Sequence, residues 1–525
     1  MPVATSLSRR SLLRLSALGT ASLLAACGQA PAPTATSPPA KPAEAPKPAD
    51  TVKPTEAPKP AEAAKPAEAP KPTEAPKPAA AAEPTKPAAP AAAAPAKSAA
   101  AANISVSVWP DVADLEINKG IIEAFQQRSP NVKVTPEQWT GTGGYYQRLQ
   151  VGIAGNTVPD MVYFQGWRWQ PYTIGGQFRE ITDLVQRDKT ALPENLFPKE
   201  DAYVRQLTLK GKNYGMPQDT GSMVVYYNKD LFDAAGVPYP KEDWSDQDFL
   251  DTIAKVQAGL QKAGKKDVYA YQPNYNDPYV RGHPLWRMHG GLEFEKLEDP
   301  KKAQWTDPAV VASWQRELFD LAKQGVAIPQ GALVGGGGDS AYYTYGIQNG
   351  LSAVKIEGPW FLPQMWGPKA VTQGGLKFDV VPMPKGSKGR SMFWQVEPVL
   401  IHKSSKSPDA AWEYLKFMVG PDGQRYVAEG GRMTNTPESI VKQWVPIAQK
   451  LYSFENAKAF AQAEGAAMVL TGGVDTGSLQ VKGGQNAARD AIMNGSKTAQ
   501  QALTEANKAT QEVMDTWWKE NPTWS

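Results

Sequence analysis

The stretch that decides the fold is NISVSVWPDVADLEINKGIIEAFQQRSPNVKV, residues Asn103–Val134. Residues Ile104–Val108 alternate between apolar and polar side chains, the period expected of a β-strand. Three apolar residues then recur on one helical face: Leu115, Ile122 and Phe125. The sequence Ser129-Pro130-Asn131 predicts the end of that helix, and Val132–Val134 resumes a strand. The stretch therefore predicts a strand–helix–strand unit.

The same alternation continues along the chain. Tyr146, Leu149 and Ile153 form a second helical stripe, and Met161–Phe164 has the composition of a buried strand. Strands that alternate with helices predict a parallel sheet with helices on both faces. Ligands of such sheets bind beyond the carboxyl ends of the strands. Five residues follow strand ends and are candidates for ligand contact: Trp109, Asp111, Gln165, Trp167 and Trp169.

The first 26 residues have the features of an export signal. Arg9, Arg10 and Arg14 precede a short apolar run that is too short to span a bilayer comfortably. The paired arginines resemble a twin-arginine signal, with the general secretion route as the alternative. Leu24-Ala25-Ala26-Cys27 resembles the bacterial lipobox, and Cys27 is the only cysteine of the chain. Residues 1–26 are predicted to be removed, leaving Cys27 as a lipid attachment site.

Residues 27–102 are predicted to be a disordered tether. Alanine, proline, lysine, glutamate and threonine make up nearly all of this segment, and the motif KPAEAP recurs at Lys41–Pro46 and Lys65–Pro70. Regular prolines prevent helix propagation, and almost no side chain could form a core. A polyproline-like chain of this length would reach on the order of 200 Å. A glycosylated stalk is the alternative interpretation.

Residues 103–525 are long enough for two domains. The net charge of +3 and the 21% of charged residues show no basic stripe, so no nucleic-acid partner is expected. The 16 tryptophans have two interpretations: core residues, or the aromatic surfaces of a carbohydrate-binding cleft.

Four motifs together resemble the sugar-binding type of extracellular solute-binding protein, the relatives of maltose-binding protein. They occur in the order found in that family: Gly211–Pro217, Tyr226–Gly236, Ile356–Trp360 and Ser407–Phe417. The resemblance covers nearly all of residues 103–525. It implies a periplasmic-binding-protein-like α/β fold with two lobes, joined by hinge crossovers, that close over a ligand.

By this resemblance the first lobe holds residues 103–217 and 397–437, and the second lobe holds residues 218–396. Residues 438–525 form a C-terminal helical region that the sequence assigns to neither lobe. Crossovers are expected near Pro217-Gln218, near Gln395–Glu397 and around Thr434–Pro437.

The resemblance implies a set of ligand-binding residues between the lobes. Trp167 and Trp360 are expected to face the cleft from opposite lobes, with Trp360 already exposed to water before ligand binds. The complete set is Trp109, Asp111, Gln165, Trp167, Gln218, Asp219, Asn274, Tyr275, Glu357, Gly358, Trp360 and Glu397.

Enzymatic motifs are absent from the sequence. The three histidines, His283, His289 and His402, form no HExxH pattern, and no GxSxG motif occurs. Gly259–Lys266 looks like a phosphate-binding loop, but it lacks the required Ser/Thr, and Gly264 is better explained as the end of a helix. Gly335–Gly338 is interpreted as a flexible loop.

No catalytic residue, metal or cofactor is therefore expected. A glycosidase that uses Glu357 and Glu397 is one alternative, since two suitably spaced carboxylates suffice for that chemistry. A surface protein that binds the cell wall is another. Glycerol phosphates or peptides are alternative ligands on the same scaffold.

The expected partners are a carbohydrate, the permease subunits of an ABC importer, and the membrane through lipidated Cys27. The expected location is the extracytoplasmic face of the cell membrane, and a monomer is expected.

Overall fold

The computed structural model describes residues 101–139, 142–197, 203, 205–333, 346–366, 376–462, 465–467 and 473–522. The predicted signal segment, Cys27, all but the last two residues of the predicted tether, and the Gly335–Gly338 loop lie outside the described residues.

The first sheet contains the strands that the opening stretch predicts. Its order is β14 (Ala466–Ala467), β13 (Met392–Ile401), β3 (Met161–Tyr163), β1 (Ala102–Val108) and β2 (Val132–Gln138), and β6 (Gly215–Ser222) also pairs with β13. β1 is parallel to both β2 and β3, which confirms the predicted parallel unit. β13 runs antiparallel to β3 and β6.

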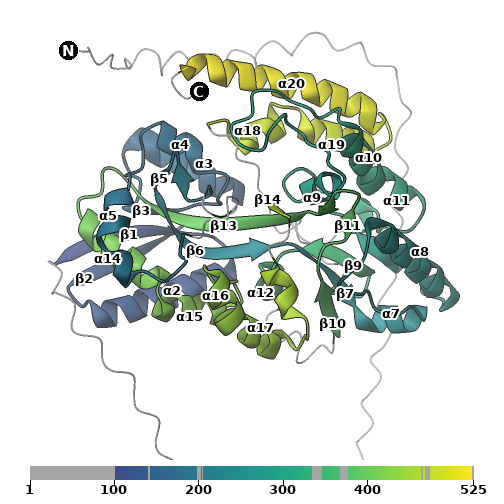
Figure 1. Cartoon of the computed structure of the whole chain (residues 1–525), viewed down its shortest axis with the longest axis horizontal. Helices are drawn as coiled ribbons and strands as arrows, with labels where there is room; N and C mark the ends of the chain where they lie inside the picture. The colour runs from purple at the N-terminus through teal and green to yellow at the C-terminus, as the bar shows by residue number, and fades with distance from the viewer. Residues whose placement is uncertain are drawn as a thin grey trace, which may run out of the picture. The chain divides into compact units, whose positions relative to one another are not determined.

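Four helices pack around this sheet: α2 (Val112–Arg128), α3 (Thr142–Gly155), α14 (Pro408–Val419) and α15 (Pro421–Glu429) (Figure 1). Three smaller elements lie at its margin: α4 (Gln170–Ile174), α5 (Thr182–Arg187) and the hairpin of β4 (Thr208–Leu209) and β5 (Lys212–Asn213). The α2 helix ends at the predicted place, where the Ser129 N–H donates to the Phe125 carbonyl. Its buried apolar face is Ile117, Ile121, Ile122 and Phe125, whereas Leu115 is only partly buried. Ile122 and Phe125 are therefore buried as predicted, and Leu115 lies at the edge of the buried face.

The second sheet has four strands, in the order β10 (Phe378–Val381), β7 (Val224–Asn228), β9 (Ser352–Glu357) and β8 (Tyr269–Gln272). Its helices are α7 (Lys229–Ala235), α8 (Asp246–Lys262), α9 (His283–Arg287), α10 (Pro308–Gln315), α11 (Leu321–Lys323) and α12 (Phe361–Trp366), with a small hairpin of β11 (Lys385–Gly386) and β12 (Gly389–Arg390). Gly264 follows α8 at φ +75°, and the Lys265 N–H returns to the Leu260 carbonyl. These contacts confirm a helix end rather than a phosphate loop.

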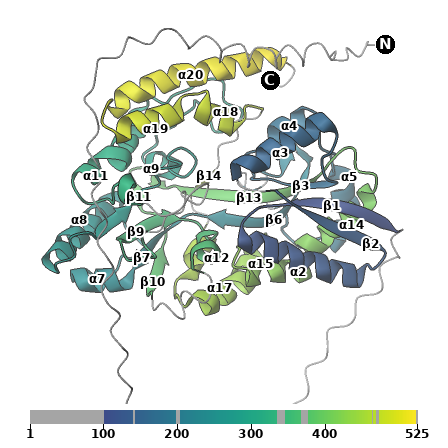
Figure 2. The ribbon, with the colours of Figure 1, turned by 180° about the vertical axis from the view of Figure 1, so that it is seen from behind.

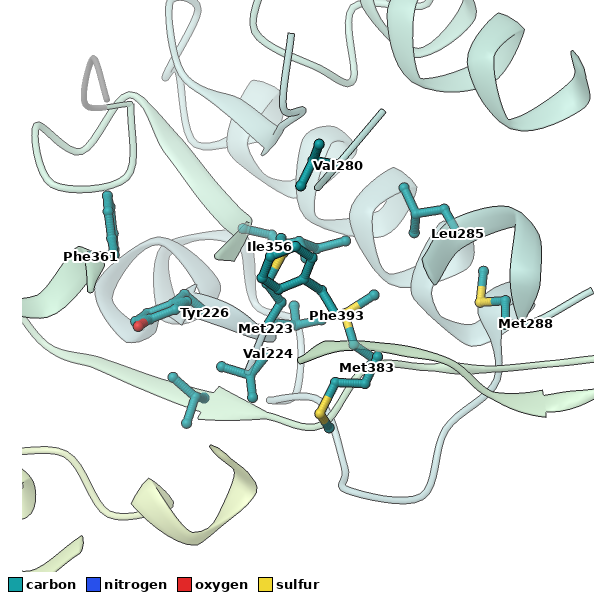
Figure 3. Packing of buried hydrophobic residues seen from close by; sticks show 14 of the residues in the cluster. Met223, Val224, Tyr226, Val280, Leu285, Met288, Ile356, Phe361, Met383 and Phe393 are labelled. Atoms are coloured by element: carbon teal, nitrogen blue, oxygen red, sulfur yellow. The ribbon is translucent and has the colours of Figure 1, made fainter. Parts of the chain in front are cut away.

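The core around the second sheet is apolar and continuous. Figure 3 shows Met223, Val224, Ile356 and Phe393 close together, with other buried residues of the same cluster, such as Leu285 and Met288, around them. The ring of Tyr226 belongs to the same cluster, and its hydroxyl donates to the Gly358 carbonyl at 2.8 Å. This core holds in place the turn between β9 and α12.

Two long antiparallel strands, β6 and β13, run from the first sheet toward the second (Figures 1 and 2). Their register runs from Leu400↔Gly215 to Trp394↔Ser222 and shifts between Glu397 and Pro398. The expected crossovers near Pro217-Gln218 and Gln395–Glu397 fall within these strands. The lobe boundaries drawn from the sequence remain a prediction.

The C-terminal region divides into two packed groups. α16 (Pro437–Ser439) and α17 (Val445–Tyr452) follow α15, and Trp444 and Tyr452 belong to the core cluster around the second sheet. α18 (Thr476–Val481), α19 (Gln485–Met493) and α20 (Ala499–Glu520) form the yellow-green and yellow layer at the top of Figure 1. The Asn507 and Gln511 side chains of α20 accept from backbone N–H groups at Trp305 and Ala303. In the part of the chain that the structure describes, no helix is both long and apolar enough to cross a membrane.

Candidate functional site

A cavity lies where the loops after β1, β3 and β9 meet strand β13. Its lining residues are Trp109, Asp111, Tyr163, Gln165, Trp167, Asp277, Val280, Arg281, Trp360, Phe393, Gln395, Glu397 and Arg432. The volume is about 60 Å³, well below the several hundred Å³ typical of ligand pockets. A ligand larger than a few water molecules would therefore require the walls to separate.

The structure brings half of the predicted site residues to this cavity. Those that line it are Trp109, Asp111, Gln165, Trp167, Trp360 and Glu397. Those that do not are Gln218, Asp219, Asn274, Tyr275, Glu357 and Gly358. Contact of the first six with a ligand remains a prediction, and the other six have different surroundings that are described below.

Aromatic rings form much of the cavity wall. Trp109 lies 5.1 Å from Tyr145 and 5.9 Å from Tyr163, measured between ring centroids. Phe393 contacts Trp167 and Trp360 edge to face, with centroids 5.7 and 5.8 Å apart. Phe393 therefore links the tryptophan that follows β3 to the tryptophan that follows β9.

Trp360 is held from several sides. Its indole N–H donates to the Glu357 carboxylate at 2.9 Å, and the Arg281 guanidinium lies 5.3 Å from the ring centroid. A Cβ atom on Gly221 would come within 2.6 Å of the ring, so glycine is required there for this close approach. The side chain is 4% exposed, which corrects the expectation that it faces water before ligand binds. The physical reason is that Gly221, Phe393 and Arg281 already cover its faces and edge.

Glu357 supports Trp360 from beneath instead of lining the cavity. Its carboxylate accepts from the Gly358 N–H at 3.0 Å and pairs with the Arg281 guanidinium. Lys355 lies 3.9 Å away, and burial lowers the pKa of Lys355 to about 8 although Glu357 opposes that shift. The predicted hydroxyl-binding carboxylate is thus occupied by protein donors.

Other residues that were predicted to contact ligand form contacts within the protein instead. Asn274 donates to the Ile356 carbonyl at 3.0 Å and accepts from Lys355 at 3.1 Å. The Tyr275 hydroxyl donates to the Ile328 carbonyl at 2.8 Å. Gly358 accepts the hydroxyl of Tyr226, as described above, and Gln218 is 2% exposed.

Trp169 was expected at the rim with Trp167 but lies in the core. It is fully buried, and its indole N–H donates to the Gln206 carbonyl at 2.8 Å. Position after a strand end therefore does not by itself place a tryptophan in the cavity.

A buried charge cluster lies on the side of the cavity formed by the first sheet. The Arg432 guanidinium donates to Asp111 at 3.0 Å and also to Asp114, which has no exposed side-chain surface. Burial raises the pKa of Asp114 to about 6, with the charge of Arg432 opposing the shift. Asp114 was not predicted, because in sequence it appears as one more polar residue of an amphipathic helix.

Glu397 and Asp219 face each other across the long strand pair. They are register partners on β13 and β6, and both are nearly fully buried. Burial is the main cause that raises the pKa of each carboxyl. The charge of Asp219 adds to the rise at Glu397, the charge of Asp114 adds to the rise at both, and Arg432 opposes both. Among the described residues, neither Glu397 Oε2 nor Asp219 Oδ2 has a hydrogen-bond partner. Glu397 at the cavity and Asp219 behind it thus each keep one carboxylate oxygen without a hydrogen bond from the described residues.

Comparison with known proteins is decisive for the family. Residues 109–425, more than half of the chain, match the family described as bacterial extracellular solute-binding protein. The chain belongs to this family. The predicted family is therefore confirmed, and the two-lobed α/β fold agrees with it.

Relatives of this solute-binding protein are described as binding proteins. A putative binding protein of Brucella abortus is 24% identical over 326 residues, covering 57% of this chain and 67% of the relative. The galactooligosaccharide-binding protein of Bacillus subtilis is 24% identical over 330 residues, covering 62% of this chain and 70% of the relative.

Solved structures show the same fold. The Listeria monocytogenes substrate-binding protein Lmo0181, in complex with cycloalternan, is 20% identical with a TM-score of 0.64, covering 79% of this chain and 99% of the other. Maltose-bound MalE3 of T. maritima is 18% identical with a TM-score of 0.61, covering 79% of this chain and all of the other.

Several cavity residues of this solute-binding protein escaped sequence reasoning. They are Tyr163, Asp277, Val280, Arg281, Phe393, Gln395 and Arg432. Arg281 and Arg432 lie far along the chain from β1 and β3, whose ends predicted the position of the ligand site. A usable signal existed only for Tyr163 and Gln395, which belong to segments that were already assigned to a rim strand and a crossover.

Proposed function

We propose that this solute-binding protein captures a carbohydrate outside the cell and delivers it to an ABC importer. The proposal includes export with removal of residues 1–26, and anchoring to the outer face of the membrane through a lipid on Cys27. The tether would let the binding domain reach ligand at a distance from the membrane. The protein acts as a receptor and not as a hydrolase in this proposal.

The cavity wall is the observation that carries the proposal. Trp109, Trp167 and Trp360 line it together with Phe393, and Asp111, Gln165 and Glu397 lie among them. A sugar ring has apolar C–H faces and hydroxyl groups around its edge. Flat aromatic surfaces with polar groups beside them match both features. The names of two relatives, which specify galactooligosaccharides and arabinooligosaccharides, agree with this ligand class.

Capture requires the two sheets to move relative to each other. The cavity of about 60 Å³ does not admit even a monosaccharide unless its walls separate. The β6 and β13 strands connect the walls, so bending within this pair would open and close the site. A ligand that contacts both walls would stabilise the closed form, which a permease could then recognise.

The proposal is tested by calorimetric titration of the purified full chain with a library of neutral and amino oligosaccharides. Saturable binding of at least one sugar, without product formation on prolonged incubation, is the expected result. Small-angle scattering with and without that sugar should show a smaller radius of gyration in the bound state.

Trp109→Ala should weaken binding at least tenfold, which corresponds to about 1.4 kcal/mol. Trp518→Ala is the matched control, because Trp518 lies on α20 against Trp517 and does not line the cavity. Sugar hydrolysis would establish the glycosidase alternative, and failure of every sugar to bind would refute the proposal.

A further inference from the structure

Acidic groups outnumber cations around the cavity. Asp111, Asp277 and Glu397 line it, and Asp114, Asp219 and Glu357 lie behind its wall. The cations that line it are Arg281 and Arg432, and Lys355 lies behind Glu357. Burial raises the pKa of Asp277 as well, although the nearby Arg281 opposes the shift.

The cations are already engaged with particular carboxylates. Arg432 binds Asp111 and Asp114. Arg281 pairs with Glu357 and lies 3.9 Å from Asp277. The remaining acids, Glu397 and Asp219, form no ion pair within the residues that the structure describes.

Glu397 is the one of these two acids that lines the cavity. It lines the cavity, is 3% exposed, and has no hydrogen-bond partner at Oε2 within the described part of the chain. Asp219 stands directly opposite on the neighbouring strand, where two like charges are destabilising. The charge of Arg432 opposes the rise in pKa at both acids, but its guanidinium already pairs with Asp111 and Asp114. An ionised Glu397–Asp219 pair therefore calls for a further positive charge, because a buried charge without a partner is costly.

We propose that the ligand carries a protonated amine that binds against Glu397, so that its chemical class is an amino sugar. This inference rests on the proposed function, since it specifies the sugar bound in the same cavity. An ammonium group supplies three donors and a positive charge, and the Glu397 carboxylate offers the acceptor. The faces of Trp109 and Trp167, which line the same cavity, would add cation–π attraction.

The alternative is structural: Glu397 and Asp219 share one proton and take no part in specificity. The two interpretations differ in what a ligand amine contributes to affinity. If the acids hold a proton permanently, replacing a ligand hydroxyl by an amine gains nothing. If the amine replaces that proton, the amine strengthens binding.

The test compares sugars that differ at one substituent. Chitosan oligosaccharides carry an amine where cello-oligosaccharides of the same length and linkage carry a hydroxyl, and N-acetylated chito-oligosaccharides carry a neutral amide. Titration calorimetry of the full chain at neutral pH should show at least tenfold tighter binding of the amine form than of either neutral form. Spermidine serves as a cation without a sugar ring.

Glu397→Gln should abolish the preference for the amine, so that the amine form and the neutral forms bind this variant with similar affinity. Asp219→Asn, whose side chain does not line the cavity, should reduce the preference by a smaller factor and provides a second variant if the first fails to fold. Glu429→Gln is the matched control, because Glu429 is exposed on α15 and pairs with Arg425.

The outcomes separate this inference from the proposed function. Equal or tighter binding of neutral sugars by the unmodified protein, or a preference that survives in Glu397→Gln, overturns the inference and leaves the carbohydrate receptor intact. Binding of spermidine but of no sugar overturns both the amino-sugar ligand and the carbohydrate receptor, and it would assign the cavity to a cation without a sugar ring. Binding of none of these probes overturns both.

Discussion

Replacing Asp114 by asparagine should stabilise the protein at neutral pH. Asp114 lies in the first turn of α2, is completely buried, and contacts Arg432. Burial raises its pKa from 3.8 to about 6, so the folded protein binds a proton at this side chain more tightly than the unfolded chain does. Asparagine has nearly the same shape as protonated aspartate and cannot ionise. The substitution therefore keeps an uncharged side chain at this buried position at every pH.

The size of the effect follows from the displacement of the pKa. The rise of the Asp114 pKa from 3.8 to about 6 corresponds to roughly 3 kcal/mol of unfolding free energy, at about 1.36 kcal/mol for each pH unit. Between pH 3.8 and about 6 the folded protein binds more protons at Asp114 than the unfolded chain does. The free energy of unfolding consequently falls as the pH rises through this window. The stability contributed by the protonated group is fully present below pH 3.8 and is lost above about pH 6.

The assay is urea unfolding at a series of pH values from 3.5 to 7.5. Asp114→Asn should match the unmodified protein near pH 3.5 and exceed it by up to about 3 kcal/mol at pH 7. The control is Asp422→Asn, which removes an exposed carboxylate paired with Arg128 and should shift stability by less than about 0.5 kcal/mol. A difference between Asp114→Asn and the unmodified protein that does not change with pH would refute the reasoning. So would a loss of stability in the variant at pH 7.

Three further perturbations test other parts of the molecule. Trp360→Ala should lower the free energy of unfolding by about 3–5 kcal/mol and weaken sugar binding at least tenfold, whereas Trp360→Phe should keep most of the stability; equal effects of both variants in thermal melts would contradict this. Arg168→Gln should raise the dissociation constant of the bound sugar two- to fivefold, because Arg168 follows Trp167 along the chain and pairs with Asp475 of the C-terminal region at 3.1 Å. Arg128→Gln is the control. An unchanged rate of sugar dissociation in stopped-flow measurements would exclude a role of this ion pair in closure. Cys27→Ser should release the protein from the membrane fraction or leave the precursor uncut; fractionation and gel migration identical to the unmodified protein would exclude lipidation.

The parts of the fold that were predictable depend on local patterns. The Ile104–Val108 strand alternates between apolar and polar side chains, and that period is visible in five residues. The end of α8 was equally visible, since Gly264 adopts a backbone conformation that other residues avoid. Both features are determined within one or two turns of the chain, so the sequence contains the complete signal.

From the residue pattern alone, cavity residues were predictable where they follow a strand of the parallel unit, whereas Trp360 and Glu397 were predicted from the family resemblance. Trp109 and Gln165 reach the cavity for this reason. Tyr275 does not line the cavity, because the sequence does not determine the direction of a side chain in a loop, and its hydroxyl donates to the Ile328 carbonyl. Arg432 was missed because its partners lie more than 300 positions earlier, and no local pattern records a contact of that separation. The pairing of Arg432 with Asp111 and Asp114 therefore forms only in the folded chain and leaves no local pattern in the sequence.

Glu397 belongs both to the cavity and to the strand pair that connects the two sheets. The β13 register shifts between Glu397 and Pro398, and a proline has no N–H to donate to the neighbouring strand. The ladder between β6 and β13 is consequently interrupted at one point, and an interruption is where a strand bends most easily. If bending of this strand pair opens the cavity, as we propose, a ligand group that neutralises Glu397 would act directly on the segment that bends. Recognition and closure then require no long chain of intermediate contacts, because the same residue participates in both.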